Sequence, residues 1–448
     1  MLHRALAVFA FIFAAQAAKP AEVTSFTLDN GMEVVVLEDQ RAPVVVHMVW
    51  YRVGAADEPR GLSGIAHYLE HLMFKGTETT EDGDFSRIVS ENGGTDNAFT
   101  SWDYTAYFQR VAADRLPLMM AMEADRMINL SIDAEAMETE RQVVLEERAT
   151  RTENDPGSLF SEQRRAAQYL HHPYRIPIIG WRHEINEIGL EDLQAFYKAH
   201  YAPNNAILIV AGDVTPEEVR ALAEEHYGPI PANPEIEVRD RIEEPPQLAE
   251  RRLMFRDARV SQPYVVRSYL APERDAGDQT AAAHLNMLSE VLGGASATSV
   301  LGRALVLDQE VSVYADAYYL GTSLDDTTFT LIAVPAEGVS LEEVEAAMDA
   351  VVADFIETGV DPAQLERIKT QVRAALIYGE DNLSGLARRY GSALTSGLTV
   401  ADVQGWPELL RSVTAEEIQD AATLLLDRNR AVTGYFLPLE DPDPEVMQ

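Results

Sequence analysis

The sequence predicts an α+β protein made of two homologous halves of about 200 residues each, a size typical of single domains. Its 448 residues are too many for one ordinary core. Apolar runs rich in β-branched residues alternate along the chain with stretches of helical periodicity. Residues 189–214 predict a helix, a short turn and a β-branched strand, and residues 414–438 repeat that order. This recurrence is the main indication of two related halves.

The first twenty residues, "MLHRALAVFAFIFAAQAAKP", have the pattern of a secretory signal peptide. A basic Arg4 precedes an apolar run that is too short to span a bilayer, and Ala15-Gln16-Ala17 forms a small-x-small cleavage site. We expect residues 1–17 to be the signal peptide, with cleavage after Ala17 and export to the periplasm or the medium. No later stretch is long and apolar enough for a membrane helix, so the mature chain is expected to contain no integral membrane segment.

The composition restricts the partners and the metal chemistry. The formal net charge of −37 disfavours nucleic acid and anionic membranes, and it would attract basic peptides or cations. Solubility or adaptation to salt explains the same charge equally well. The chain has no cysteine, which excludes disulfides and thiolate metal sites. Any metal site must therefore use His, Asp or Glu.

The first half begins with strand signals and then a helix. "FTLDNGMEVVVLEDQ" predicts two strands joined by an Asn30-Gly31 turn, and "APVVVHMVWYRVG" predicts a buried strand. The following stretch, "GIAHYLEHLMFKGT", predicts a helix with Ser63 as its N-cap and Gly76 as its end.

The rest of the first half predicts a strand, a long helical region and a closing strand and helix. Residues 95–111, "TDNAFTSWDYTAYFQRV", are expected to form one strand after the Gly93-Gly94 turn. Helix is expected from about 116 to 152, and a strand in "NNAILIVAGDV". Thr215 should cap the last helix, which ends at Gly228.

A stretch rich in proline and acidic residues divides the chain. It predicts a linker at 231–247 between an N-terminal domain at 18–230 and a C-terminal domain at 248–448. In the second domain "RRLMFRDARVSQPYVVRSYLA" is strand-like and "QTAAAHLNMLSEVLGG" is helical. That helix reads "HLNML" where the first half reads "HYLEH", so a metal site is expected in the first half only.

His67, Glu70 and His71 point to metal chemistry. On a helix, residues i, i+3 and i+4 share one face. Two imidazoles placed in this way can bind one zinc ion, and the glutamate beside them can take a proton from water. The order HxxEH is that of the inverted zinc peptidases. The alternative is a pair of histidines buried in the core of an apolar helix.

A zinc site needs a third protein ligand, and two glutamates are candidates. Glu140 and Glu147 are seven residues apart on a helix that Asp133 could cap. Two helical turns separate them by roughly 10 Å, so both cannot bind one ion directly. From the residues alone the choice stays open, as does the alternative that this charged face is simply solvated.

Several segments together resemble the pitrilysin/insulinase family, which includes the mitochondrial processing peptidases, notably their beta subunit, and many bacterial exported peptidases. They are "NGMEVVVLED", "GLSGIAHYLEHLMFKGT", "ENGGTDNAFTSWDYTAYF", "ETERQVVLEE", "HPYRIPIIGW" and "FYKAHYAPNNAILIVAGDV". The resemblance implies two homologous half-domains, each a mainly antiparallel sheet covered by helices. It also implies a zinc-dependent endopeptidase that hydrolyses extended peptides or unfolded segments.

The resemblance assigns roles to individual residues. The zinc ligands would be His67, His71 and Glu147, with one Zn²⁺ per chain. Glu70 would be the general base and Glu140 a supporting acid. The strand "TDNAFT" would pair with the substrate through Asn97 and Ala98. Alternatively, Asn97 is only a turn residue.

The second half departs from the family pattern at one position. Active assemblies of the family carry an arginine seven residues before a substrate-binding tyrosine. Tyr314 matches the tyrosine, but Leu307 stands at the arginine position, and Arg303 is one helical turn away. We therefore expect a heterodimer with a homologous subunit that carries the Arg/Tyr pair. The alternatives are a homodimer in which Arg303 or another residue substitutes, a catalytically silent scaffold subunit, and a zinc hydrolase of substrates other than peptides.

Overall fold

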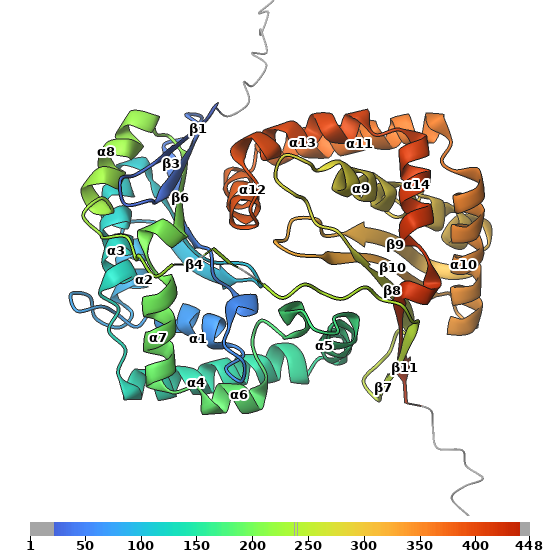
Figure 1. The fold of residues 1–448 in the computed structure, drawn as a ribbon, viewed down its shortest axis with the longest axis horizontal. Helices are drawn as coiled ribbons and strands as arrows, with labels where there is room; N and C mark the ends of the chain where they lie inside the picture. The colour runs from blue at the N-terminus through green and yellow to red at the C-terminus, as the bar shows by residue number, and fades with distance from the viewer. Residues whose placement is uncertain (1–21, 237, 240, 440–448) are drawn as a thin grey trace, which may run out of the picture.

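The computed structural model describes residues 22–236, 238–239 and 241–439, and the predicted signal peptide lies outside them. It contains two sheets, each covered by helices, which lie side by side in Figure 1. The predicted α+β class with two similar halves is confirmed.

The first sheet has six strands in the order β1-β2-β6-β3-β5-β4. Only β2 and β6 pair in parallel; the other neighbours are antiparallel. Strands β3 and β6 are buried on both faces, which explains their mainly apolar sequences; the buried His47 of β3 bonds to Gln109 and Tyr227. The strands are β1 (Glu22–Thr27), β2 (Glu33–Glu38), β3 (Val44–Tyr51), β4 (Thr95–Thr100), β5 (Thr105–Ala112) and β6 (Ala206–Gly212).

The helices of the first half correct one prediction. The helix expected from 116 to 152 is two helices, because the chain leaves α3 at Asn129 and restarts after Asp133, whose side chain caps α4. A π-helical turn, Ala149–Glu153, follows α4. The helices are α1 (Ile65–Leu72), α2 (Asp84–Glu91), α3 (Leu116–Ile128), α4 (Ala134–Arg148), α5 (Pro156–Gln168), α6 (Arg182–Glu187), α7 (Leu190–His200) and α8 (Pro216–His226).

The expected single strand at 95–111 is a hairpin of β4 and β5. Its turn closes with the Ser101 amide donating to the Tyr104 carbonyl at 2.8 Å. The turn residues bind distant groups: the Trp102 indole donates to the Ile176 carbonyl, and Asp103 accepts from the Tyr174 hydroxyl. These contacts bend the chain where the sequence carries no glycine or proline. Residues 251–271 likewise form two strands.

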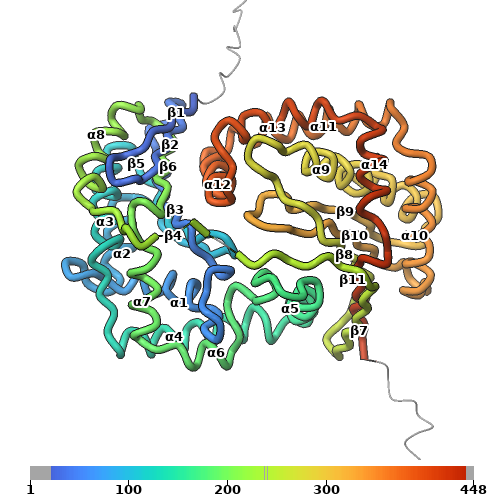
Figure 2. The backbone as a smooth tube through the Cα atoms, in the orientation of Figure 1, coloured from blue at the N-terminus to red at the C-terminus, as the bar shows by residue number. Residues whose placement is uncertain are grey.

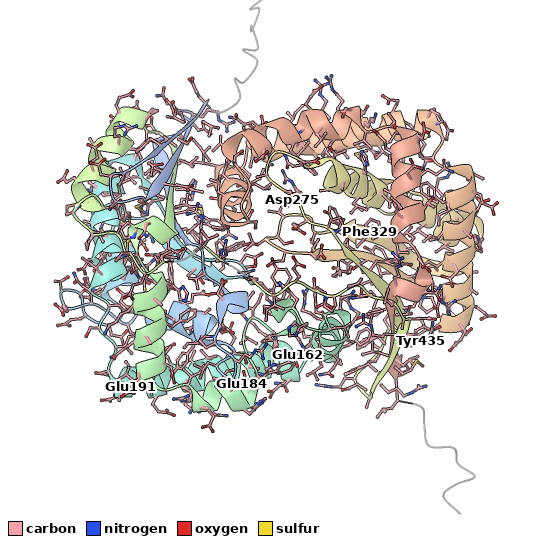
Figure 3. All side chains as sticks on the ribbon, in the orientation of Figure 1. Glu162, Glu184, Glu191, Asp275, Phe329 and Tyr435 are labelled. Atoms are coloured by element: carbon pink, nitrogen blue, oxygen red, sulfur yellow. The ribbon has the colours of Figure 1, made fainter. Side chains whose placement is uncertain are left out.

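Ser63 is not the N-cap of α1, and Gly76 does not end it. The helix begins after Gly64 and ends at Leu72. The Ser63 hydroxyl accepts the Trp181 amide at 2.9 Å, and its own amide donates to Glu184 on α6 at 2.8 Å (Figure 3). Ser63 therefore bonds to residues more than a hundred positions away in the chain and does not cap the helix.

The second sheet repeats the plan of the first, in the order β7-β11-β8-β10-β9. Its single parallel pair is β11 with β7. The predicted repeat of helix, turn and strand is α7–β6 in the first half and α14–β11 in the second. The elements are β7 (Arg251–Asp257), β8 (Tyr264–Ala271), α9 (Thr280–Leu292), β9 (Ser312–Tyr319), β10 (Thr327–Pro335), α10 (Leu341–Thr358), α11 (Pro362–Glu380), α12 (Leu383–Thr395), α13 (Val400–Ser412), α14 (Ala415–Leu425) and β11 (Ala431–Pro438).

One helix of each half packs on the sheet of the other half. Helix α12 of the second half packs on the first sheet, where Leu386 and Tyr390 join Trp50 in one buried cluster (Figure 1). Helix α5 of the first half packs on the second sheet, where Phe160 meets Val266 and Phe436. This exchange fixes the two halves against one another and places α12 beside the first sheet.

The segment that joins the halves crosses between them as a strand-free and helix-free run in its described residues (Figure 2). Its Arg241 contacts Asp57 at 2.8 Å and Asp103 at 2.5 Å in the first half, and Asp325 at 2.9 Å in the second. The linker is therefore bonded to both halves. Across the described residues, no helix has the length and apolarity needed to cross a membrane.

Candidate metal and peptide site

The start of α1 is fixed by a partly buried carboxyl group, that of Glu58. Gly64 has a φ of +89°, a left-handed value that favours glycine. Glu58 accepts the Gly64 amide at 2.9 Å and the Ala66 amide at 3.0 Å. Burial raises the pKa of Glu58, and the two amide bonds oppose that rise. Glu58 thus occupies amides that a helix start leaves unsatisfied, and it fixes the position of the helix that carries the motif.

Three side chains with metal-binding atoms converge between α1 and α4. Glu147 Oε2 lies 3.2 Å from His71 Nε2 and 3.6 Å from His67 Nε2. The three ligand atoms all lie within 4.8 Å of one another. Tetrahedral ligands of one zinc ion lie about 3.3 Å apart, so two imidazoles and a carboxylate at these distances fit zinc. No other group of this kind occurs in the part of the chain that the structure describes.

The two histidines differ in their surroundings. Burial, together with the nearby His71, lowers the pKa of His67 to about 4, so His67 is neutral at pH 7. Burial acts in the same direction on His71, but hydrogen bonds to Glu140 and Glu147 outweigh it and raise the pKa of His71 to about 9. A metal ion that binds Nε2 would displace the proton from His71.

Glu140 is not one of the three residues whose metal-binding atoms meet. It contacts His71 from the other side of the ring. Its carboxylate is 3.2 Å from His71 Nδ1, the ring nitrogen that faces away from Glu147. Lys75 Nζ lies 2.6 Å from the other Glu140 oxygen. A carboxylate on the second nitrogen of a metal-binding histidine fixes its tautomer and orientation.

Glu70 lies beside the histidines and bonds to the neighbouring strand. The Thr100 hydroxyl on β4 donates to its carboxylate at 2.5 Å. Burial raises the pKa of Glu70 to about 7, although the Thr100 bond opposes the rise. A carboxyl group with a pKa near neutrality is suited to both taking and returning a proton.

His67, Glu70, His71 and Glu147 line a hollow of about 760 Å³ that extends to β4. Strand β4 is the last in its sheet and pairs only with β5 in the described structure, so its outer edge is free. Asn97 and Ala98 both line the hollow. The Ala98 amide donates to the Asn97 Oδ1 at 2.8 Å. Asn97 belongs to a strand, and the alternative of a turn residue is wrong.

The structure does not bring Tyr314 into this hollow. Tyr314 lies on β9 at the edge of the second sheet, is 45% exposed, and donates to Asp316 at 2.6 Å. Leu307, also exposed, lies on the π-helical segment Gly302–Asp308. Arg303 is the second residue of that segment and is also exposed. None of these three side chains lines the hollow.

Sequence reasoning missed Thr100 and Arg151. Arg151 also lines the hollow, is 76% exposed, and contacts Glu147 Oε1 at 2.5 Å. Its spacing of four residues after Glu147 was a usable signal, because residues i and i+4 meet on a helix. Thr100 gave no such signal, because its bond to Glu70 joins a strand to a helix.

Comparison with known proteins identifies the class. Residues 33–181 match the family described as Insulinase (Peptidase family M16), and residues 187–372 match the Peptidase M16 inactive domain. The chain belongs to peptidase family M16, the insulinase family. The resemblance predicted from the sequence is thereby confirmed.

Individual relatives match along about half of the chain or more. The zinc protease PqqE of Helicobacter pylori is 30% identical, and the match covers 88% of each chain. A probable mitochondrial-processing peptidase subunit beta of Schizosaccharomyces pombe is 32% identical over 48% of this chain and 47% of its own. The crystal structure of a Helicobacter pylori protease has a TM-score of 0.86 at 27% identity and covers 93% of this chain and 99% of its own. The periplasmic protease PqqL of Escherichia coli shares the fold, with a TM-score of 0.80 at 21% identity over 94% of this chain and 48% of its own.

Proposed function

We propose that this chain is a zinc-dependent endopeptidase that hydrolyses extended peptides or unfolded segments. The observation that carries the proposal is the convergence of His67, His71 and Glu147 beside Glu70 in one hollow. When bound by these three residues, zinc supplies Lewis-acid chemistry that polarises a carbonyl and acidifies water.

Glu70 is the proton carrier of the proposed reaction. It takes a proton from the attacking water and returns it to the leaving amine. Thr100 donates to one of its oxygens and so orients the carboxylate, and this leaves the second oxygen to accept a proton. Glu140, with Lys75 behind it, holds His71 in place.

The free edge of β4 is the proposed peptide-binding element. An extended peptide that adds to this edge gains main-chain hydrogen bonds and so binds with little side-chain selectivity. To pair with the Ala98 amide, such a peptide takes the place of the Asn97 side chain. Since Thr100 on the same strand contacts Glu70, the peptide is brought beside the general base.

We also propose that a homologous subunit completes the site. Leu307 stands where the family pattern has arginine, and the exposed Tyr314 does not line the hollow that contains His67 and Glu70. A partner that supplies an arginine would stabilise charge on the peptide carbonyl. The homodimer is the alternative. We propose export of the chain, on the basis of the sequence at residues 1–17.

The test is cleavage of a mixed set of quenched fluorescent peptides by the zinc-loaded mature chain, alone and with a homologous subunit that carries the Arg/Tyr pair. A chelated sample and Glu70→Gln are the controls. We expect cleavage with the partner and its loss in both controls.

Each outcome decides between the alternatives. Cleavage by the chain alone supports the peptidase and contradicts the need for a partner arginine. No cleavage in either arm, with zinc bound, contradicts the peptidase and favours the silent scaffold subunit.

A further inference from the structure

A cation from the second half lies beside the proposed peptide-binding strand. Arg388 is an exposed residue of α12, the helix that packs on the first sheet. Its guanidinium carbon is 4.6 Å from the centre of the Phe99 ring and 4.9 Å from that of Phe108. Phe99 also lines the hollow that contains His67 and Glu70. Arg388 does not line the hollow itself but stacks on Phe99, which does.

The Arg388 guanidinium is held by aromatic rings and not by an acid. Within the described ranges, no carboxylate forms an ion pair or hydrogen bond with it. This is notable in a chain with 73 acidic and 36 basic residues. Stacking on two rings orders an arginine side chain while its N–H donors stay available to a ligand.

The two faces of β4 point to different surroundings. Ala98 and Thr100 face α1, since Ala98 packs against the first core and Thr100 bonds to Glu70. Alternation along a strand sends Asn97 and Phe99 to the opposite face, where Phe99 packs with the α12 cluster. A peptide added to the β4 edge alternates in the same way. Side chains that point to the Phe99 face therefore approach Arg388.

The spacing permits direct contact. Neighbouring strands lie about 4.8 Å apart, a distance that an arginine and a glutamate span together. Side chains of adjacent strands on the same face contact one another. A carboxylate on that face of the peptide would thus meet the guanidinium fork.

We propose that Arg388 is a specificity-determining residue that selects an acidic side chain at one position of the bound peptide, on the face of β4 that carries Phe99. This inference rests on the proposed function. It concerns one position of the peptide, where an acidic side chain is preferred although the overall negative charge of the chain attracts basic peptides.

The test uses peptides that carry Glu, Gln or Lys at each of six positions in turn around the cleaved bond. The readout is the ratio of kcat/KM for the Glu and Gln peptides, measured on the zinc-loaded enzyme in the assembly that cleaves. At one position we expect the Glu peptide to be favoured about fivefold, the upper range for an exposed ion pair. Arg388→Gln should bring the ratio to about one, and Arg388→Glu should favour Lys at that position.

Arg389→Gln is the matched control. Arg389 is the next residue of the same helix, but its guanidinium lies over Gly379 of α11 and not over Phe99. The control removes the same charge and should retain the preference for Glu. Because each ratio compares two peptides on one sample, a partial loss of folded enzyme does not change it.

The outcomes separate this inference from the proposed function. Cleavage with a ratio near one at all positions, or a ratio unchanged in Arg388→Gln, overturns the role of Arg388 and leaves the peptidase intact. If no peptide is cleaved, binding of the same peptides to the zinc-loaded chain is measured by fluorescence anisotropy. Tighter binding of a Glu peptide that Arg388→Gln abolishes supports the inference although the proposed function fails. Equal binding, or none, overturns it.

Discussion

Glu140 and Glu147 belong to one helix, and their surroundings give them different chemistry. Glu147 approaches the Nε2 atoms of both histidines, whereas Glu140 meets only His71 Nδ1 and Lys75. Hydrogen bonding to His71 lowers the pKa of Glu147, which keeps it ionised and able to bind a cation. Lys75 places its positive charge beside Glu140, where a metal-binding carboxylate would have the metal ion instead.

Variants at the two glutamates should therefore differ in their affinity for zinc. We predict that Glu147→Gln abolishes measurable zinc binding in competition with a chelator, because it removes one of three ligands. Glu140→Gln should weaken binding by roughly 10- to 100-fold, the usual effect of losing a residue that orients a ligand. The exposed Glu146→Gln is the neighbouring control. Equal losses in the first two variants would contradict these roles.

At the scale of elements, the contact between α12 and the first sheet depends on a glycine. A Cβ at Gly391 would lie 2.0 Å from the buried Trp50 ring, so the helix and the ring are in direct contact. Gly405, on α13, has no atom within 4 Å of the equivalent position.

We predict that Gly391→Ala lowers the free energy of unfolding by roughly 1–3 kcal/mol through overpacking. Gly405→Ala should instead raise it by about 0.5–1 kcal/mol, because alanine favours the helix. Unfolding midpoints by calorimetry compare the two. A stabilising Gly391→Ala would mean that α12 does not pack on Trp50 as described.

The second half contains a buried ion-pair cluster between α10 and the second sheet. Because of this cluster, the free energy of unfolding is expected to change with pH in the acid range. Glu345 is 2.6 Å from Arg252 and 2.5 Å from Arg267, and it accepts from the Tyr435 hydroxyl, labelled in Figure 3. Burial acts to raise the pKa of Glu345, but the hydrogen bonds and the two arginines outweigh it and lower the pKa to about 2.

Since the pKa of Glu345 is lower in the folded chain, its stabilisation is present above the unfolded pKa of about 4.3 and is lost as the pH falls toward 2. We predict that Glu345→Gln lowers the free energy of unfolding at pH 7 by about 1.5–3 kcal/mol, because it removes charged hydrogen bonds to Arg252 and Arg267 while Asp349 still pairs with the buried Arg267. The deficit should shrink between pH 5 and pH 3, whereas the exposed Glu342→Gln should show no such trend. Thermal unfolding across this pH range checks it, and a constant deficit would be the contrary result.

Local sequence patterns predicted the elements in which the buried residues follow a single regular spacing along the chain. Strand β3 and strand β6 were expected because their residues are mainly apolar and rich in β-branched side chains. The turn between β4 and β5 was missed because Ser101–Tyr104 contain no glycine or proline, and the turn-favouring Ser101 and Asp103 stand within an alternating run; distant partners of Trp102 and Asp103 stabilise the turn. The same holds for the site: the motif was visible on one helix, but the bonds of Glu58 and Thr100 join separate elements and no local period encodes them.

At the scale of the whole molecule, the halves are joined by exchanged helices and by the linker. Arg241 is buried between carboxylates of both halves, with 6% of its side chain exposed. Arg41 also joins the halves, through Asp39 and Asp381, but it lies in solvent.

We predict that Arg241→Gln lowers the free energy of unfolding by about 3 kcal/mol, because Asp57 and Asp103 lose their guanidinium partner and keep only weaker contacts. Arg41→Gln should cost less than about 1 kcal/mol, as exposed pairs contribute little. Calorimetry gives the stabilities, and small-angle X-ray scattering reports whether the halves separate. Equal small effects would show that the linker does not hold the halves together.

The most direct measurement for the central claim is the zinc X-ray absorption spectrum of the zinc-loaded mature chain, together with its metal content. The account predicts one zinc ion per chain with two imidazole nitrogens at about 2.0–2.1 Å and carboxylate oxygen at about 2.0–2.2 Å. In His71→Ala the bound zinc should be lost. A chain that holds no zinc, or a spectrum without imidazole scattering, would contradict the proposed centre.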